Sequence, residues 1–502
     1  MKKILATILA LVMALALTAT VWADGDGTAS GSMTGADFLA KAKNGAITLA
    51  DDVTLSTSCS ISDGQTYTIN LNGHTLSADN TTIMLRHGKL IVNGTGTIKE
   101  NSPYFGAILV KGSENSADEN YSVVEVNAGV TLEGWSAIFV DQNAAKAYGV
   151  SVTVNGAVLN GAKDTGGSVG NGLYVNGSIT HTKNAPEISL KNTTITATGE
   201  GMYLAGYATT TLTNCNITGM TGVEIRAGKL TVNGGSFTAT APYSVSPNGN
   251  GSTTVGAAIA VAQHTTKKNI EVALNGGTYT GEKAISESNP QANDPAPQVA
   301  MSVTAGTFVG DVVTADVNNF ITGGTFSSAV NPDFLADTVN YKVSGTNSVS
   351  YFTNLNDAVA AAGADDEVKN LKETSAHSGS TVTLKDGETV ITTLHTEAAT
   401  VDLPTLTKSG YTFKGWKDED GKVYNGKLTI LEENGGELVV REAVTLTAVW
   451  SANSYYYYPS TSTTDSTTGK ASPKTFDAGI GVYAVTAVMS LTGLAYTGKK
   501  KF

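Results

Sequence analysis

The sequence predicts an all-β fold, a coil of similar rungs called a parallel β-helix (solenoid), and three observations predict it. A turn phrase of Asn-Gly-Gly, then Ser or Thr and an aromatic residue, stands at 233–238 and 275–280, with looser copies at 305–308 and 322–327. Short strands with apolar residues at every second position flank these phrases. The composition includes 55 glycines and only 15% charged residues. A turn signal that recurs between short strands is typical of stacked repeats.

The N-terminus has the features of a secretory signal. Lys2 and Lys3 precede an uncharged apolar run that ends near Val21, and Ala23 stands where a signal peptidase would read a small residue. We expect residues 1–23 to be a signal peptide, with cleavage between Ala23 and Asp24.

Residues 24–53 are expected to cap the coil, because apolar residues have helical spacing at 35–43. The coil itself is expected over 54–345, with two alternating kinds of strand. The first kind has a Gly or Ala lead-in, and the second ends in the Asn-Gly turn. Inward Ile, Leu and Val should fill the bore. Asn side-chain amides should hydrogen-bond from rung to rung at the turns, where Gly permits φ > 0. Strands of the first kind lie at 106–110, 136–140, 172–175, 201–204, 222–225 and 257–261.

The stretch from Thr54 to Tyr341 resembles the right-handed pectate-lyase-like β-helix of many bacterial surface proteins, and 69–76 resembles its opening rungs. The alternative is a string of immunoglobulin-like sandwiches, which the uneven strand intervals and the absence of a repeated Cys or Trp disfavour. Residues 346–378 are expected to form a C-terminal cap or connector, with helical spacing at 354–362.

Residues 379–450 carry an aromatic signature. It runs from Leu403-Pro404 to Gly415-Trp416, continues at Gly421-Lys422-Val423-Tyr424 and closes at 444–450. The signature closely resembles the internalin-type B repeat, also called the Listeria-Bacteroides repeat, which implies a small β-grasp-like module of an exported protein. We expect its large aromatic residues to form the module's core rather than to contact a ligand: Phe413, Trp416, Tyr424 and Trp450.

The C-terminal region predicts a tether and an anchor. Residues 451–471 are rich in Ser, Thr and Tyr, as in an extended stalk. Within 472–502, the uncharged run 478–496 is long enough to cross a bilayer and is followed by a basic tail. The motif Ser472-Pro473-Lys474-Thr475 resembles the sorting signals of sortase substrates in Gram-positive bacteria, which implies cleavage after Thr475. Ser472 and Phe476 depart from the usual signal, so a plain single-span tail is the alternative.

Charge and cysteine content exclude some functions. The formal net charge is −12 with only three arginines, which argues against nucleic acid as a partner. Cys59 and Cys215 should lie several rungs apart in a coil, so no disulfide is expected, and Cys215 should be a small buried side chain.

No catalytic constellation is apparent. A polysaccharide-cleaving coil needs carboxylates that converge from neighbouring rungs, but the paired acids, 51–52 and 365–366, lie in the expected end regions. Glu224 and Arg226 share a strand face and are expected to form a solvated pair. The six histidines, among them His74 and His264, show no metal-ligand spacing and are expected on turns or on the surface. We expect no catalytic, cofactor-binding or metal-binding residue, and no cofactor.

These features together predict an exported protein held at the cell surface of a Gram-positive bacterium, by the cell wall through sortase or by the membrane through its C-terminal segment. We expect non-catalytic adhesion or recognition, with a glycan or a host or neighbour protein bound along a flank of the coil. The alternatives are a polysaccharide lyase or hydrolase and a passive surface-layer or spacer protein.

Overall fold

A computed structural model describes residues 25–434 and 437–453, which divide into two compact units between Phe320 and Ile321. The expected signal peptide, stalk, sorting motif and C-terminal span fall outside the described residues. Among the residues that are described, no helix has the length and apolar character needed to span a membrane.

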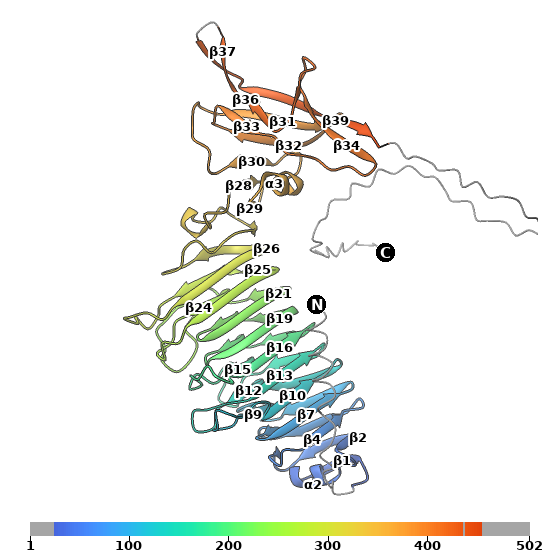
Figure 1. Cartoon of the computed structure of the whole chain (residues 1–502). Helices are drawn as coiled ribbons and strands as arrows, with labels where there is room; N and C mark the ends of the chain where they lie inside the picture. The colour runs from blue at the N-terminus through green and yellow to red at the C-terminus, as the bar shows by residue number, and fades with distance from the viewer. Residues whose placement is uncertain (1–24, 435–436, 454–502) are drawn as a thin grey trace, which may run out of the picture. The chain divides into compact units, whose positions relative to one another are not determined.

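The first unit is a coil of parallel strands, as the sequence predicts (Figure 1). It opens with β1 (Thr28–Met33), which pairs in parallel with β2 (Ala46–Leu55). Between them, α2 (Gly35–Ala40) lies in the segment expected to be helical and buries Phe38 completely. The Thr34 hydroxyl caps this helix by accepting a hydrogen bond from the Asp37 backbone N–H. Parallel pairing therefore begins within the region 24–53 that was expected to be only a cap.

Three ladders of parallel strands run along the coil, one strand from each ladder in every full rung. The first ladder contains β4 (Thr66–Asn70), β7 (Gly88–Asn93), β10 (Ser122–Val126), β13 (Val150–Asn155), β16 (Glu187–Lys191), β19 (Ala208–Gly219), β21 (Gly228–Ala239), β25 (Ile270–Ser288) and β26 (Val299–Val313). The second contains β5 (Thr75–Ala78), β8 (Gly96–Glu100), β11 (Val130–Gly134), β14 (Val158–Gly161) and β17 (Thr194–Ala197), and continues in later parts of β19, β21, β25 and β26.

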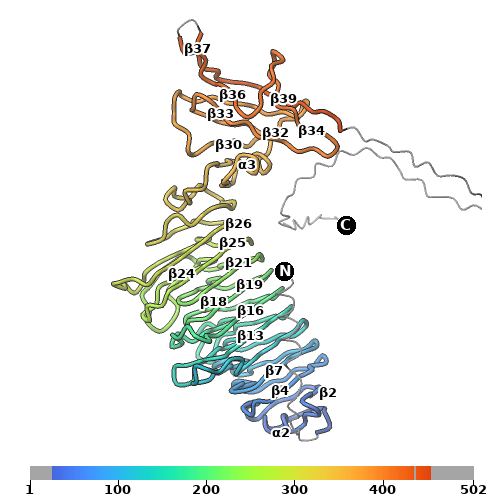
Figure 2. Tube along the Cα trace, in the orientation of Figure 1, coloured from blue at the N-terminus to red at the C-terminus, as the bar shows by residue number. Residues whose placement is uncertain are grey.

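The third ladder is the one that carries the candidate site. It contains β3 (Cys59–Ile61), β6 (Ile83–Leu85), β9 (Ile108–Lys111), β12 (Ser136–Asp141), β15 (Asn171–Val175), β18 (Glu200–Leu204), β20 (Thr221–Ile225) and β24 (Ala257–Ala262), and it ends in the last parts of β25 and β26. Loops protrude from the coil on the side where β24 lies (Figure 2). One of them holds the antiparallel pair β22 (Ser244–Val245) and β23 (Thr254–Val255).

The recurring turn phrase has a clear structural role. Gly235 adopts φ 107°, and a Cβ there would lie 2.1 Å from the Cys215 carbonyl oxygen of the neighbouring rung, so only glycine fits. The aromatic residue of the phrase points into the bore, where Phe237, Tyr279 and Phe308 stack at 5.2 and 4.8 Å. All three side chains are fully buried.

The expected amide ladder is present at the same corner of the rungs. Asn127 Nδ2 donates to Asn93 Oδ1 at 2.7 Å, and Asn275 Nδ2 donates to Asn233 Oδ1 at 3.0 Å. Both cysteines are free and buried, which confirms that they form no disulfide.

The second unit is a mixed sheet with one α-helix. Its strand order is β27 (Gly324–Phe326), β29 (Val349–Phe352), β28 (Tyr341–Ser344), β30 (Glu367–Asn370), β32 (Thr389–Thr396), β31 (Ser380–Asp386), β39 (Ala443–Ala452), β34 (Tyr411–Lys417) and β35 (Val423–Tyr424). The pairs β30–β32 and β31–β39 are parallel and the others antiparallel. Two further antiparallel pairs are β33 (Thr400–Asp402) with β36 (Lys427–Thr429), and β37 (Leu431–Asn434) with β38 (Glu437–Val440). A 3₁₀ turn spans Pro332–Phe334.

Trp416 lies at the centre of this unit, fully buried, with its indole N–H donating to the Pro404 carbonyl at 2.8 Å. Phe413 packs edge-on between Trp416 and Trp450, as expected of a packing core. The helix α3 (Leu355–Ala361) contributes Ala358 and Val359 to the same core. The expected connector 346–378 thus supplies part of the core of the second unit.

Candidate functional site

Aromatic side chains line up along the outer face of the third ladder. Phe139, Tyr174 and Tyr203 hold the same register position on β12, β15 and β18, and Glu224 holds it on β20. The residues before and after this position, such as Leu173 and Val175, point inward and are fully buried. The parallel register therefore places one outward aromatic residue on each of three consecutive rungs.

Three more aromatic residues from rung ends extend this row, and we call the set the aromatic strip: Tyr104, Phe105, Trp135, Phe139, Tyr174 and Tyr203. Neighbouring ring centroids lie 4.5–6.5 Å apart from Tyr104 at one end to Tyr203 at the other. The strip is exposed at its first end, where Tyr104 is 57% and Phe105 44% accessible. Phe139 is 7% accessible, and Tyr203, at the other end, is 3% accessible.

A buried carboxylate orders the exposed end of the strip. Glu100, at the end of β8, is fully buried. Its Oε1 accepts from the Phe105 backbone N–H at 3.1 Å and its Oε2 from the Trp135 N–H at 3.2 Å. Burial raises the pKa of Glu100, although these backbone donors oppose the shift. One side chain thus fixes the backbone of two strip residues on successive rungs.

Beyond Tyr203, the outer face carries charges under the loop that contains β22 and β23. Glu224 accepts hydrogen bonds from the Thr253 N–H at 2.9 Å and the Thr253 hydroxyl at 2.6 Å. The Arg226 guanidinium donates to the Tyr203 hydroxyl at 3.0 Å and to the Asn248 carbonyl at 3.0 Å, and also to the Gly251 carbonyl. Glu224 and Arg226 are fully buried, so the expectation of a solvated pair is wrong. The loop covers the strand face that the sequence pattern indicated was exposed.

Burial raises the pKa of Glu224 to about 7, and the neighbouring Glu200 carboxyl adds to the shift. The hydrogen bonds from Thr253 and the positive charge of Arg226 act in the opposite direction. Burial also raises the pKa of Glu200, which is 6% accessible. Glu224 is accordingly partly protonated near neutral pH.

A polar pocket of about 290 Å³ adjoins the buried end of the strip. This volume is near the lower end of the range for small-ligand sites, roughly 300 Å³. Asn176, which lines it, donates to Asp141 at 2.9 Å, and Asp141 in turn pairs with Lys111 at 3.1 Å. The lining comes from two strands and four loop segments: Tyr174, Asn176, Gly177, Ser178, Tyr203, Ala205, Gly249, Asn250, His264, Thr265 and Thr266.

His264 lines the pocket. It begins a turn, as expected, because its carbonyl accepts from the Lys267 N–H at 3.0 Å, but it is only 5% accessible, so the alternative of a surface position is wrong. Its Nδ1 accepts from the Thr266 backbone N–H at 3.3 Å, which leaves the ring proton on Nε2. Burial lowers the pKa of His264 to about 4, with a smaller contribution from Arg226, so the ring is neutral at pH 7.

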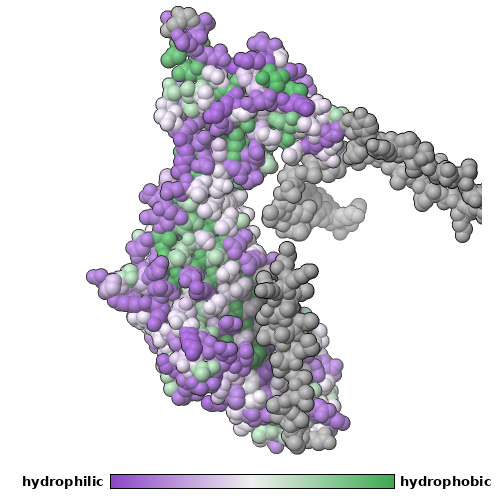
Figure 3. Space-filling view, viewed as in Figure 1, coloured by the Kyte–Doolittle hydropathy of each residue, from purple (hydrophilic) through white to green (hydrophobic). Residues whose placement is uncertain are grey.

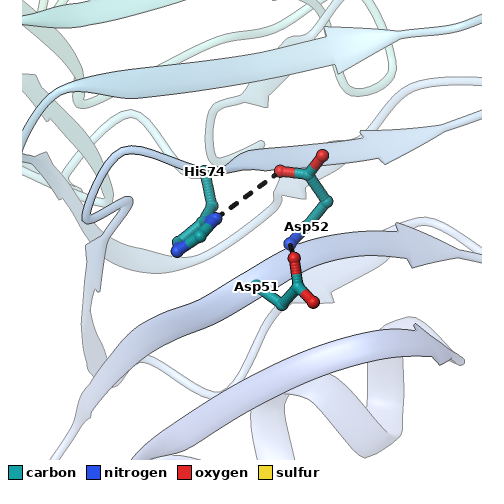
Figure 4. Close-up of side chains that lie close together, drawn as sticks. All are labelled: Asp51, Asp52 and His74. Atoms are coloured by element: carbon teal, nitrogen blue, oxygen red, sulfur yellow. Dashed lines mark hydrogen bonds and ion pairs between the residues drawn. The ribbon is translucent and has the colours of Figure 1, made fainter.

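A separate cluster, Asp51, Asp52 and His74, lies on the first rungs (Figure 4). Its potential metal-ligand atoms lie within 4.8 Å of one another, so it is the set of described residues that could hold a cation. Asp52 Oδ1 already accepts from the Thr75 N–H at 2.8 Å, and Asp51 Oδ1 accepts from the Asp52 N–H at 2.8 Å. The sequence singled out the acid pair and the histidine separately but gave no reason to join them.

The residues to which the sequence assigns a role, Ala23, Asp24 and the 472–475 motif, lie outside the described residues. Sequence reasoning missed the aromatic strip and His264. A signal for the strip was present, because aligning the strands at 136–140, 172–175 and 201–204 places Phe139, Tyr174 and Tyr203 in one column. For His264 no signal was available, since its burial depends on loops.

Residues 381–449 match the family model of the Listeria-Bacteroides repeat domain, which confirms the resemblance seen in that segment. Domains of this family occur in surface proteins, and the match indicates a surface-associated, exported protein. No curated protein and no solved structure matches the chain.

Proposed function

We propose that this protein binds glycans at the cell surface through the outer face of the third ladder, and that it serves adhesion or recognition without catalysis. One observation carries the proposal: a continuous aromatic strip, exposed at one end, leads along the strands to a polar pocket.

A sugar ring has an apolar C–H face and an edge of hydroxyl groups. Aromatic rings pack against the apolar face, and neutral polar groups hydrogen-bond the hydroxyls. Successive rungs repeat at roughly 4.8 Å, and the ring spacing of 4.7 and 5.1 Å along Phe139, Tyr174 and Tyr203 follows it. Such a row suits an extended chain of similar units better than one compact ligand.

The surface of the coil supports exposure to water. On the visible face of the molecule, hydrophilic residues cover most of the coil, and apolar residues form smaller patches (Figure 3). The expected signal peptide, stalk and C-terminal anchor would present this coil outside the cell. Attachment by sortase or by a single membrane span is part of the proposal, as is a pectate-lyase-like relationship of the coil.

The test is a binding screen of the full-length chain against soluble polysaccharides and a glycan array. The double variant Tyr104→Ala/Phe105→Ala removes two exposed rings, each worth about 1 kcal/mol against an apolar face, so affinity should fall about 10- to 30-fold. Val158→Ala is the matched control, since Val158 is 36% accessible but lies on the second ladder. Equal losses in both variants, or no glycan binding, would contradict the proposal, and binding to a host or neighbour protein alone would favour a protein partner.

The second candidate is a polysaccharide-cleaving enzyme, favoured by Glu200, Glu224 and Arg226 on neighbouring rungs. A glycosidase uses one protonated and one ionised carboxyl, and a Glu224 pKa of about 7 suits a general acid. Against it, the Glu224 and Arg226 side chains are fully buried and hydrogen-bonded to the covering loop. New reducing or unsaturated ends in the polysaccharide screen, lost in Glu224→Gln, would replace the binding-only function. A chain without binding or cleavage would be a passive spacer.

A further inference from the structure

We infer that the polar pocket is the subsite for an uncharged sugar terminus, and that it discriminates against acidic sugars. The inference rests on the proposed glycan binding and names the ligand class that the pocket takes. Two observations support it. The pocket presents neutral hydrogen-bonding groups, and none of the residues that line it is charged.

His264 offers a fixed donor to the pocket. Its Nδ1 is occupied by Thr266, through the backbone N–H at 3.3 Å and the hydroxyl at 3.0 Å. The proton therefore stands on Nε2, which has no hydrogen-bond partner among residues 25–434 and 437–453. A Cβ added to Gly177 would lie 3.4 Å from this Nε2, so the glycine leaves the space beside the donor open. A ligand hydroxyl is the natural acceptor there.

The pocket holds no formal charge at pH 7. Its described lining consists of neutral side chains, and burial keeps the His264 pKa at about 4. Arg226 interacts with Tyr203 of the lining, but it is fully buried and donates to Tyr203, Asn248 and Gly251. Lys111 is paired with Asp141, whose other oxygen accepts from Asn176. An incoming carboxylate would lose its hydration and contact no cation in the lining, because Arg226 is fully buried and acts on the pocket only through its charge near His264.

The pocket is also continuous with the aromatic strip. Tyr174 and Tyr203 belong to both, and Tyr174 contacts Trp135 at 5.6 Å toward the exposed end. A chain that packs on the half-buried rings of Trp135 and Tyr174 would place its last unit near His264. The pocket is therefore suited to an end unit, and the strip to the units that precede it.

The experiment titrates the full-length chain with methyl glycosides of glucose, galactose and mannose, and with methyl glucuronide, at pH 7. We expect at least one neutral glycoside to bind about 10-fold more tightly than the glucuronide and to shift the imidazole NMR signals of His264. His264→Phe removes the donor and keeps the ring, and should weaken neutral glycoside binding about 10-fold. Glucuronide binding as tight as the best neutral glycoside, or unchanged His264 signals, would overturn the inference.

A second variant guards against misfolding of His264→Phe. Gly177→Ala adds a Cβ that would lie 3.3 Å from His264 Cε1 and 3.4 Å from its Nε2, and its backbone angle is not in the left-handed region. This methyl narrows the space beside the donor and should weaken glycoside binding about 10-fold, with the fold checked by the unfolding temperature. If polysaccharides bind and Tyr104→Ala/Phe105→Ala weakens them while both pocket variants bind normally, the pocket inference fails and the proposed function stands. If no polysaccharide binds at all, both fail.

Discussion

Glu224 makes the stability of the coil depend on pH in a direction that can be measured. It is fully buried beneath the loop that carries Thr253, and burial with the nearby Glu200 raises its pKa from 4.5 to about 7. In the unfolded chain its pKa is close to the ordinary value of 4.5. The folded state therefore binds more protons than the unfolded state between these two values.

The sign follows from this difference. The Glu224 contribution is fully present below pH 4.5 and is lost as pH rises through about 7. A difference of about 2.5 pKa units corresponds to about 3 kcal/mol, at 1.36 kcal/mol for each unit. Glu100 and Glu287, whose pKa values burial also raises, act in the same direction. His264, whose pKa is lowered to about 4, acts in the opposite direction as pH falls.

Because several groups contribute, the assay compares the wild-type chain with Glu224→Gln, which keeps the side-chain shape and does not titrate. Urea unfolding is followed at pH 5 and pH 8 by circular dichroism, and hydrogen exchange reports separately on β20 and on residues 243–255. Between these pH values, wild type should lose about 2.5 kcal/mol more than the variant, because part of the contribution is already lost at pH 5. Parallel pH profiles for the two chains would refute the argument that burial under the loop sets the Glu224 pKa.

Three further predictions concern other parts of the chain. Trp416→Ala should destabilise the second unit by about 3–5 kcal/mol, since it empties the centre of a core, whereas Tyr411→Ala at a 45% accessible position should cost far less; equal thermal shifts would contradict this. Glu100→Gln should cost about 1–3 kcal/mol and speed hydrogen exchange at the Phe105 and Trp135 amides, because Gln cannot accept from both; unchanged exchange would exclude the positioning role. Dithiothreitol should leave the unfolding temperature unchanged and native Cys59, with its pKa raised to about 12 by burial, should resist alkylation; a thermal shift on reduction would reveal a disulfide.

The repeated residues predicted the parallel coil as far as Phe320. The copy of the phrase at 322–327 lies in the second unit, where β27 pairs antiparallel with β29, so the expected end of the coil at 345 is wrong. Asn-Gly corners, alternating apolar positions and the aromatic residue of each phrase act through neighbours on adjacent rungs, and a regular coil gives each copy the same neighbours. The turn at 233–238, the stack of Phe237 on Tyr279 and the separation of Cys59 from Cys215 all follow from this regularity. The Listeria-Bacteroides segment was recognised for a similar reason, because its aromatic spacing is characteristic of the module.

The candidate site could be predicted only in part. The column of Phe139, Tyr174 and Tyr203 is readable once the strands are aligned, because parallel register preserves position along a strand. The burial of Glu224 and Arg226 could not be predicted from the sequence. Period-two alternation places them on the outer face, but whether that face meets water depends on where residues 243–255 fold.

By itself, then, the sequence determined an all-β coil of parallel rungs and a second module of a known kind, since both depend on local patterns that repeat or are specific in spacing. Only the tertiary structure decided which outer face is covered, which charges are buried and where a pocket opens. Those properties arise from non-repeating loops whose ends are distant in sequence, as in the contact of Thr253 with Glu224 and of His264 with the space beside Gly177. Burial then sets the protonation of the same side chains, and with it the kind of ligand the site can accept.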